Sequence, residues 1–236
     1  MISLTIETLL GKLEAGTEDF DVSVSFIEIY QEKVFDLMSE KVNESIYSKG
    51  RAYNGSTKIS IRNSEDAQEI LKSCNKKRHI RATTLNSSSS RSHAMFSIIL
   101  TKQETSSIMH ICDLAGSEGL RNTNHSGVAQ HEGVTINQGL LAVGKVVKAL
   151  SSGNKLIPYR DSVLTTVLQD SLNVRSFLTI LACVSPARKD RNETFSTIRF
   201  AQSVKVLDGK SVPEFNAYLK EKQVSLWVKY FISHES

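Results

Sequence analysis

Hydrophobic and polar positions along this chain follow two periods, and the shorter period predicts three strands. The run VSVSFIEIY at 22–30 has the β-branched and aromatic composition of a strand, with partial alternation. HAMFSIILT at 93–101 and SIMHICDL at 107–114 have the same character and are joined by a short connection. A fourth run, SFLTILACVSP at 176–186, is almost wholly apolar, which predicts a strand covered on both faces.

Segments with apolar residues three or four positions apart predict helices. The first segment, MISLTIETLLGKLEAG, turns Leu9, Leu10 and Leu13 toward a core. A second helix begins at NSEDAQEILKSC, where Asn63 or Ser64 is the cap. Three further helices are predicted. The first is TINQGLLAVGKVVKALSSG, which ends at Gly153. The second is DSVLTTVLQDSL, whose cap is Asp161 or Ser162, and the third is NETFSTIRFAQSVKVL. Strands that alternate with helices predict an α/β sheet protein.

The composition is that of an ordinary globular protein and sets few limits on function. Its 236 residues allow one large domain or two small ones, and a net charge of +4 is compatible with an acidic partner without requiring one. Of the three cysteines, which follow no metal spacing, Cys112 and Cys183 lie in apolar runs and are predicted to be buried thiols in a reducing compartment. No apolar run reaches the roughly 18 residues that span a bilayer, and the first residues make a poor signal peptide.

Two loops next to predicted strands carry the candidate chemistry. The first, NSSSSRSH at 86–93, has the composition of a linker but leads directly into an apolar run. In the second, DLAGSE at 113–118, a strand ends in Asp113 and Gly116 follows. A strand-end aspartate can hold a water on Mg²⁺, and a glycine can bring its N–H close to a phosphate. Taken alone, DLAG also fits an ordinary turn.

Together, at their spacing, the two loops resemble switch I and switch II of the kinesin motor domain. Core segments of that family are matched in the same order by SFIEIYQEKVFDL (25–37), INQGLLAVGKVVKAL (136–150), IPYRDSVLTTVLQDSL (157–172) and ETFSTIRFAQSVK (193–205). The resemblance covers 1–207 and leaves 208–236 as an unmatched C-terminal extension. The wording of 117–141 looks most similar to Nod-type kinesins, within or near the chromosome-associated kinesin-10 group.

The resemblance implies a site for ATP or ADP with Mg²⁺. Ser89 and Ser90 match the switch I serines, one placed beside the attacking water and the other, Ser90, on the metal. Arg91 matches the arginine that pairs with the switch II glutamate, here Glu118, and closes the loops over the γ-phosphate. The implied catalytic residues are Ser89, Ser90, Arg91 and Glu118, and the implied cofactor-binding residues are Asn86, Ser90, Asp113 (through water) and Gly116.

The resemblance also implies binding to microtubules. Helix 135–150 and the loop after it match the face that kinesins place against the acidic surface of tubulin, and the candidate contacts are Lys145, Lys148, Lys155 and Arg160. Such contacts are salt-sensitive. Lysines on an amphipathic helix can also be its solvated face, and Val163 stands where the family often has lysine. The implied location is the cytoplasm and cytoskeleton, with the spindle or chromosomes as further partners and no membrane.

The basic cluster at 76–81 is predicted to be a solvated helix end, since no aromatic residues interleave with it as in nucleic-acid sites.

One expected part of a kinesin is missing from this sequence. No G-x-x-x-x-G-K-[ST] phosphate loop occurs, and we expect an N-terminally truncated, incomplete kinesin-type core: a central mixed β-sheet flanked by helices, without its first strands. The edges of 107–114 and 176–186 are then left unpaired, unless VSLWVKYFI at 224–232 covers one. The predicted function is that of a kinesin-like microtubule-binding protein that is not catalytically self-sufficient. The alternatives are a working ATPase with further sequence upstream, and a non-motor tubulin-binding module.

Overall fold

The chain folds as two compact units, Met1–Ala115 and Gly116–Ser236. A computed structural model describes residues 2–14, 20–41, 43–48, 55–84, 91–116, 128–173, 176, 178–204 and 231–232. No helix in these ranges is long and apolar enough to cross a membrane.

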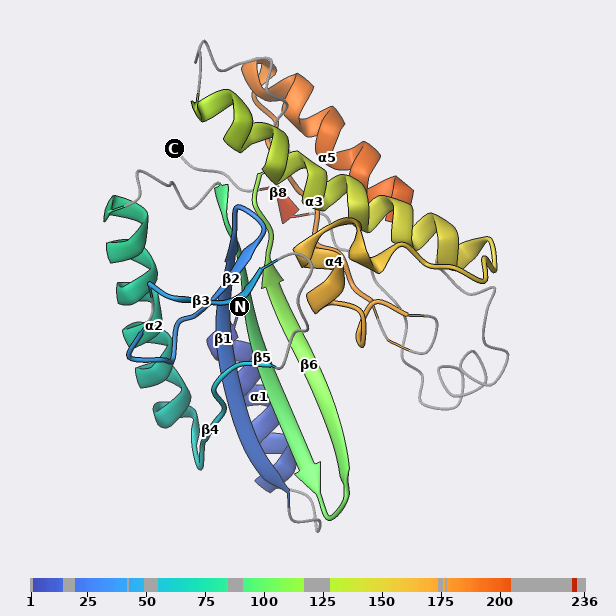
Figure 1. Cartoon of the computed structure of the whole chain (residues 1–236). Helices are drawn as coiled ribbons and strands as arrows, with labels where there is room; N and C mark the ends of the chain where they lie inside the picture. Colours follow the sequence, from blue (N-terminus) through green and yellow to red (C-terminus); the bar gives the residue numbers. More distant parts are fainter. Residues whose placement is uncertain are drawn as a thin grey trace. The chain divides into compact units, whose positions relative to one another are not determined.

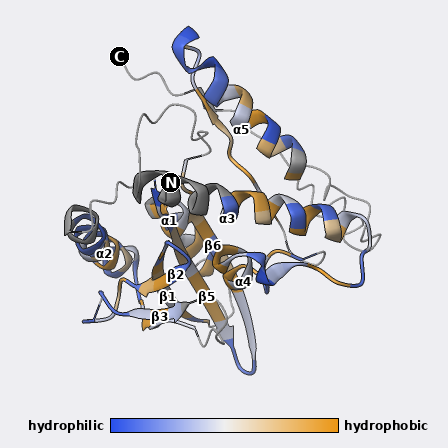
Figure 2. Cartoon of the chain, turned by 45° about the horizontal axis from the view of Figure 1, so that its top comes forward, coloured by the Kyte–Doolittle hydropathy of each residue, from blue (hydrophilic) through white to orange (hydrophobic). Residues whose placement is uncertain are grey.

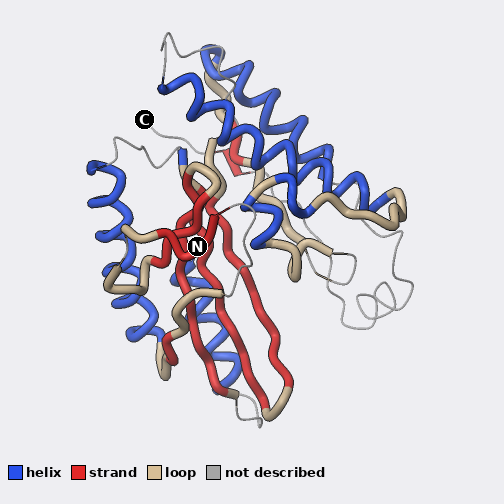
Figure 3. Tube along the Cα trace, in the orientation of Figure 1, coloured by secondary structure: helices blue, strands red, loops and turns tan. Residues whose placement is uncertain are grey.

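The first unit is built on an antiparallel sheet, with strands in the order β3-β2-β1-β5-β6 and with β4 also pairing with β1 (Figure 3). Its strands are β1 (Asp21–Tyr30), β2 (Lys33–Asp36), β3 (Ser45–Ser48), β4 (Ile59–Ser60), β5 (His93–Lys102) and β6 (Thr105–Asp113). The turn between β1 and β2 places Gln31 and Glu32 at φ of 49° and 55°, the two positive φ values that a tight two-residue hairpin turn needs. The strands predicted at 22–30, 93–101 and 107–114 are therefore confirmed.

Two helices, α1 (Ile2–Glu14) and α2 (Ser64–Thr84), pack with one face of this sheet (Figure 1). The core between them includes Ile6 and Leu10 of α1 and the edge-to-face pair Phe26 and Phe96, whose ring centroids are 5.7 Å apart. Helix α2 begins as predicted, because the Asn63 side chain accepts a hydrogen bond from the Asp66 N–H at 2.8 Å. The α/β class with a helix-flanked sheet is thus confirmed, although the described strand pairs of this sheet are antiparallel where a mixed sheet was expected.

The second unit is mainly helical, with α3 (Val128–Ser151), α4 (Val163–Val167) and α5 (Arg191–Val204) and two single turns, η3 (Tyr159–Asp161) and η4 (Arg188–Asp190). Hydrophobic and hydrophilic bands alternate along α3 and α5 (Figure 2), and α3 buries Leu140, Val143 and Val147. Ser162 caps α4 in a reciprocal capping box with Thr165. Gly153 takes φ +65° directly after α3, which confirms the predicted stop.

Two predictions from apolar runs are wrong. Within 176–186 the described residues form a strand only at β7 (Cys183–Val184), which pairs in parallel with β8 (Phe231–Ile232), so the C-terminal segment does meet part of this run. Apolar composition alone does not supply the hydrogen-bonded neighbour that a strand needs. Cys112 and Cys183 are exposed, and only Cys74 is buried, because β6 is the last strand in the sheet order and β7 has two residues.

Candidate functional site

Three residues form a row across the sheet at the end of β6. Ala94 of β5 lies opposite Glu28 of β1 and opposite Asp113 of β6 in the strand register. Directly opposed residues point to the same face of a sheet, and Ala94 belongs to the core that packs with α1 and α2. Two carboxylates therefore flank a small methyl group on the helix-covered face.

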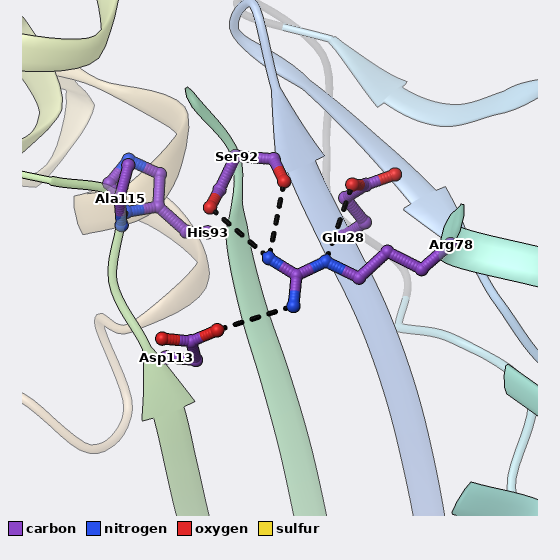
Figure 4. A network of polar contacts seen from close by, with 6 residues as sticks. All are labelled: Glu28, Arg78, Ser92, His93, Asp113 and Ala115. Carbon is purple, nitrogen blue, oxygen red and sulfur yellow. Dashed lines mark hydrogen bonds and ion pairs between the residues drawn. The ribbon is translucent and has the colours of Figure 1, made fainter. Parts of the chain in front are cut away.

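Arg78 of α2 joins the two carboxylates (Figure 4). Its Nη1 donates to Asp113 Oδ2 at 3.2 Å, and its Nε lies 3.6 Å from Glu28 Oε1. Its Nη2 donates to the Ser92 carbonyl at 3.5 Å and to the Ser92 hydroxyl at 3.3 Å. The Arg78 side chain is 14% exposed and that of Glu28 is 3% exposed, whereas that of Asp113 is 70% exposed. The guanidinium thus neutralises a buried acid on one side and meets a solvent-facing acid on the other.

This arrangement corrects the prediction for the basic cluster at 76–81. Helix α2 continues to Thr84, so the cluster lies inside the helix and one of its sides faces the sheet. Arg78 is mostly buried, and Lys77 donates to the Ser39 carbonyl at 3.1 Å. Lys76 and His79 are exposed, as predicted. The acid Glu28 within the apolar stretch 26–30 of β1 was the signal for a buried basic partner, since a buried charge must be paired.

His93 contacts the backbone just after β6 through a separate hydrogen bond. It precedes Ala94 in β5, so its side chain leaves the opposite face of the sheet. Its Nδ1 accepts a hydrogen bond from the Ala115 N–H at 3.0 Å, and both residues are buried. Burial lowers the pKa of His93 to about 4; Asp113 opposes this shift and Arg78 adds to it. The imidazole is therefore neutral near pH 7, with Nδ1 as its acceptor and the proton on Nε2.

The predicted nucleotide residues are only partly within the described structure. Asn86, Ser89, Ser90 and Glu118 lie outside the described residues, so their roles and the Arg91–Glu118 pair stay predictions. Asp113 is the last residue of β6, as predicted for a strand-end aspartate.

The carboxylate of Asp113 fits a Mg²⁺ ion held mainly by water and phosphates, because it is exposed at a strand end and offers hard oxygen donors. Within the described ranges no group of three His, Cys, Asp or Glu side chains could hold a metal by itself.

A second candidate surface lies on α3 and the segment after it. Its four predicted cations are all exposed, and together they are called the basic face: Lys145, Lys148, Lys155 and Arg160. Lys145 Nζ forms an ion pair with Asp161 Oδ2 at 3.2 Å. Two of the four, Lys145 and Lys148, line a hollow of about 380 Å³, whose other lining residues are Ala149, Ser152, Asn154, Leu156, Pro158 and Asp161. Leu156 on its rim is 86% exposed.

Comparisons with known proteins agree on one family. The sequence model of the kinesin motor domain matches residues 1–207. Among curated proteins, "Kinesin-like protein Nod" of Drosophila melanogaster is 45% identical over 201 residues, which cover 85% of this chain and 30% of the relative. The chain therefore spans about a third of that relative's length.

Solved structures agree. The crystal structure of the Drosophila kinesin family member Kin10/NOD with divalent manganese and ADP superposes with a TM-score of 0.67 at 37% identity, covering 87% of this chain and 62% of that one. The same values hold for Drosophila NOD docked with bovine tubulin into a cryo-EM map of nucleotide-free NOD complexed to the microtubule.

Proposed function

This chain belongs to the kinesin motor-domain family, and we propose that it binds microtubules through the basic face on α3 and the segment after it. The observation that carries this proposal is one hollow lined by two exposed cations, Lys145 and Lys148, with Lys155 and Arg160 exposed on the segment that follows α3. The similar Drosophila kinesin NOD has been docked into a cryo-EM map of its complex with the microtubule, which supports the same partner for this chain. A partner with an acidic surface fits this face because opposite potentials accelerate and orient docking.

The cations of the basic face do not contribute equally. Lys145 is already paired with Asp161, so part of its charge is neutralised before any partner arrives. Lys148 lines the same hollow, and within the described ranges no ion pair is found for it. Leu156 adds an apolar contact, and its burial on a partner is worth about 2 kcal/mol, independent of salt. We infer that binding has a salt-sensitive part from Lys148, Lys155 and Arg160 and a salt-insensitive part from Leu156.

The proposal includes an ATP–Mg²⁺ site at the end of β6. Asp113 would hold a metal-bound water, and Arg78 would fix the position of its carboxylate from α2. Magnesium supplies charge neutralisation on the phosphates when it is bound. Since the sequence contains no G-x-x-x-x-G-K-[ST] motif, we expect this chain by itself to bind nucleotide weakly and not to sustain turnover. ATP-driven movement is proposed only where a phosphate loop completes this site.

Cosedimentation with microtubules over a series of salt concentrations tests the binding face. Lys148→Ala should weaken binding at low salt by roughly threefold, the size of one exposed ion pair. Asp161→Asn should strengthen it by a similar factor, because Lys145 is then released for the partner. Lys72→Ala removes the same charge from an exposed position of α2 and serves as the matched control.

The Leu156→Ser variant separates the apolar part of the binding, because its loss should persist at high salt. If Lys148→Ala and Asp161→Asn shift the affinity in the same direction, or if Lys72→Ala weakens binding as much as Lys148→Ala, the assignment of this face is wrong.

A further inference from the structure

Two adjacent residues of β5 hold the segment that follows β6 from the two faces of the sheet. On the helix-covered face, Ala94 lies in register with Asp113, whose carboxylate is held by Arg78. From the other face, the His93 side chain accepts the N–H of Ala115. The segment Asp113–Ala115 is thereby fixed at one side chain and at one peptide group (Figure 4).

The imidazole of His93 supplies a hydrogen-bond acceptor at the point where the pairing of β5 with β6 has ended. Register pairing between β5 and β6 ends at Ala94 and Asp113, so the ladder offers no regular acceptor for the N–H of Ala115. Ala115 is only 4% exposed, and a buried N–H without an acceptor is costly. A side chain at position 93 with an acceptor close to its Cβ therefore extends the ordered backbone beyond the last paired residue of β6.

We propose that His93 is a positioning residue for nucleotide: its Nδ1 holds the N–H of the Leu114–Ala115 peptide and so fixes the backbone directly before the Ala115–Gly116 peptide, whose N–H meets the terminal phosphate. The inference rests on the proposed function, since it takes the segment after β6 to be the phosphate-facing one. The hydrogen bond itself belongs to the protein and can be measured without nucleotide. His93 contacts no phosphate in this scheme and acts through Ala115.

Two substitutions of His93 distinguish the effect of its hydrogen-bond acceptor from the effect of its ring volume. Asn has its side-chain oxygen on Cγ, where His has Nδ1, so His93→Asn keeps an acceptor at the same number of bonds from the backbone. His93→Phe keeps a ring of similar size but has no acceptor. Circular dichroism and thermal melting of both variants verify that each is folded before any comparison.

The first measurement is nuclear magnetic resonance on the full chain without nucleotide. An N–H···N hydrogen bond gives a scalar coupling between the Ala115 nitrogen and His93 Nδ1, which we expect in the unmodified chain. Exchange of the Ala115 amide with solvent should become about tenfold faster in His93→Phe and should stay close to the unmodified rate in His93→Asn. Absence of the coupling, or equal exchange in all three proteins, overturns the proposal.

The second measurement follows the Gly116 amide signal while Mg²⁺ and ATP are added. We expect a shift in the unmodified chain and in His93→Asn and a shift at least several-fold smaller in His93→Phe. If the unmodified chain and His93→Phe respond alike, the positioning role is overturned while the nucleotide site stands. If the unmodified chain gives no response but the coupling is present, the nucleotide part of the proposed function fails, and the role assigned to His93 fails with it.

Discussion

Replacement of Arg78 should be among the most destabilising single changes in the first unit. Arg78→Met keeps much of the aliphatic length but removes the guanidinium, which leaves the carboxylate of Glu28 buried without its cation. Breaking a buried ion pair from one side costs about 3–5 kcal/mol. Glu28 keeps a further interaction, and the Arg78 Nε to Glu28 Oε1 distance of 3.6 Å is longer than a hydrogen bond. We therefore expect about 3 kcal/mol, a large part of an ordinary domain's stability.

The ion pair between Arg78 and Asp113 should contribute far less to the free energy of unfolding. Asp113 is 70% exposed, so water screens its pair with Arg78, and Asp113→Asn should cost less than about 1 kcal/mol. In the double variant Arg78→Met with Glu28→Gln, the buried charge is gone, and stability should recover in part. The free energy of coupling between positions 28 and 78 should then exceed that between positions 78 and 113 by about 2 kcal/mol.

Urea-induced unfolding followed by circular dichroism gives these numbers, provided that the variants share one m value, so that a shift in midpoint reports stability. A loss of less than about 1 kcal/mol in Arg78→Met would refute the assignment of a buried, paired charge. A double variant less stable than Arg78→Met alone would refute the claim that loss of the cation beside the buried carboxylate of Glu28 is the cause.

Two further predictions concern titration and capping. Because the pKa of His93 is about 4 in the folded chain, below its ordinary value of 6.5, the unfolded state takes up the proton first on acidification. The His93 contribution is complete above about pH 6.5 and falls by about 3 kcal/mol as the pH drops to 4; His93→Phe should lack this component when unfolding is measured across that range. Ser162→Ala removes the N-cap of α4 and should cost about 1 kcal/mol, seen as a melting temperature lower by about 2–4 °C. An unchanged melting temperature in Ser162→Ala would contradict the cap.

Local signals in the amino-acid sequence were enough to locate most of the helices and strands. Alternation and β-branched composition located β1, β5 and β6, and apolar spacing with caps located α1, α2, α3 and α5. The caps at Asn63 and Ser162 and the stop at Gly153 are short-range features, because a cap bonds to a group three residues away and a positive φ is a property of one residue. The two loop motifs and their order along the chain were also sufficient to indicate the kinesin family, which the match over residues 1–207 confirms.

Contacts between these elements, in contrast, followed only from the three-dimensional arrangement. The sequence pattern predicted that Arg78 belongs to a solvated cluster, whereas α2 places it between two carboxylates that are 85 residues apart in sequence, on strands β1 and β6. His93 looked like the end of a serine-rich loop, and its acceptor role follows from where the ladder between β5 and β6 ends. The apolar run at 176–186 failed as a strand for the same reason. Strand pairing and burial of charge depend on neighbours distant in the chain, and a pattern read along one segment carries no information about them.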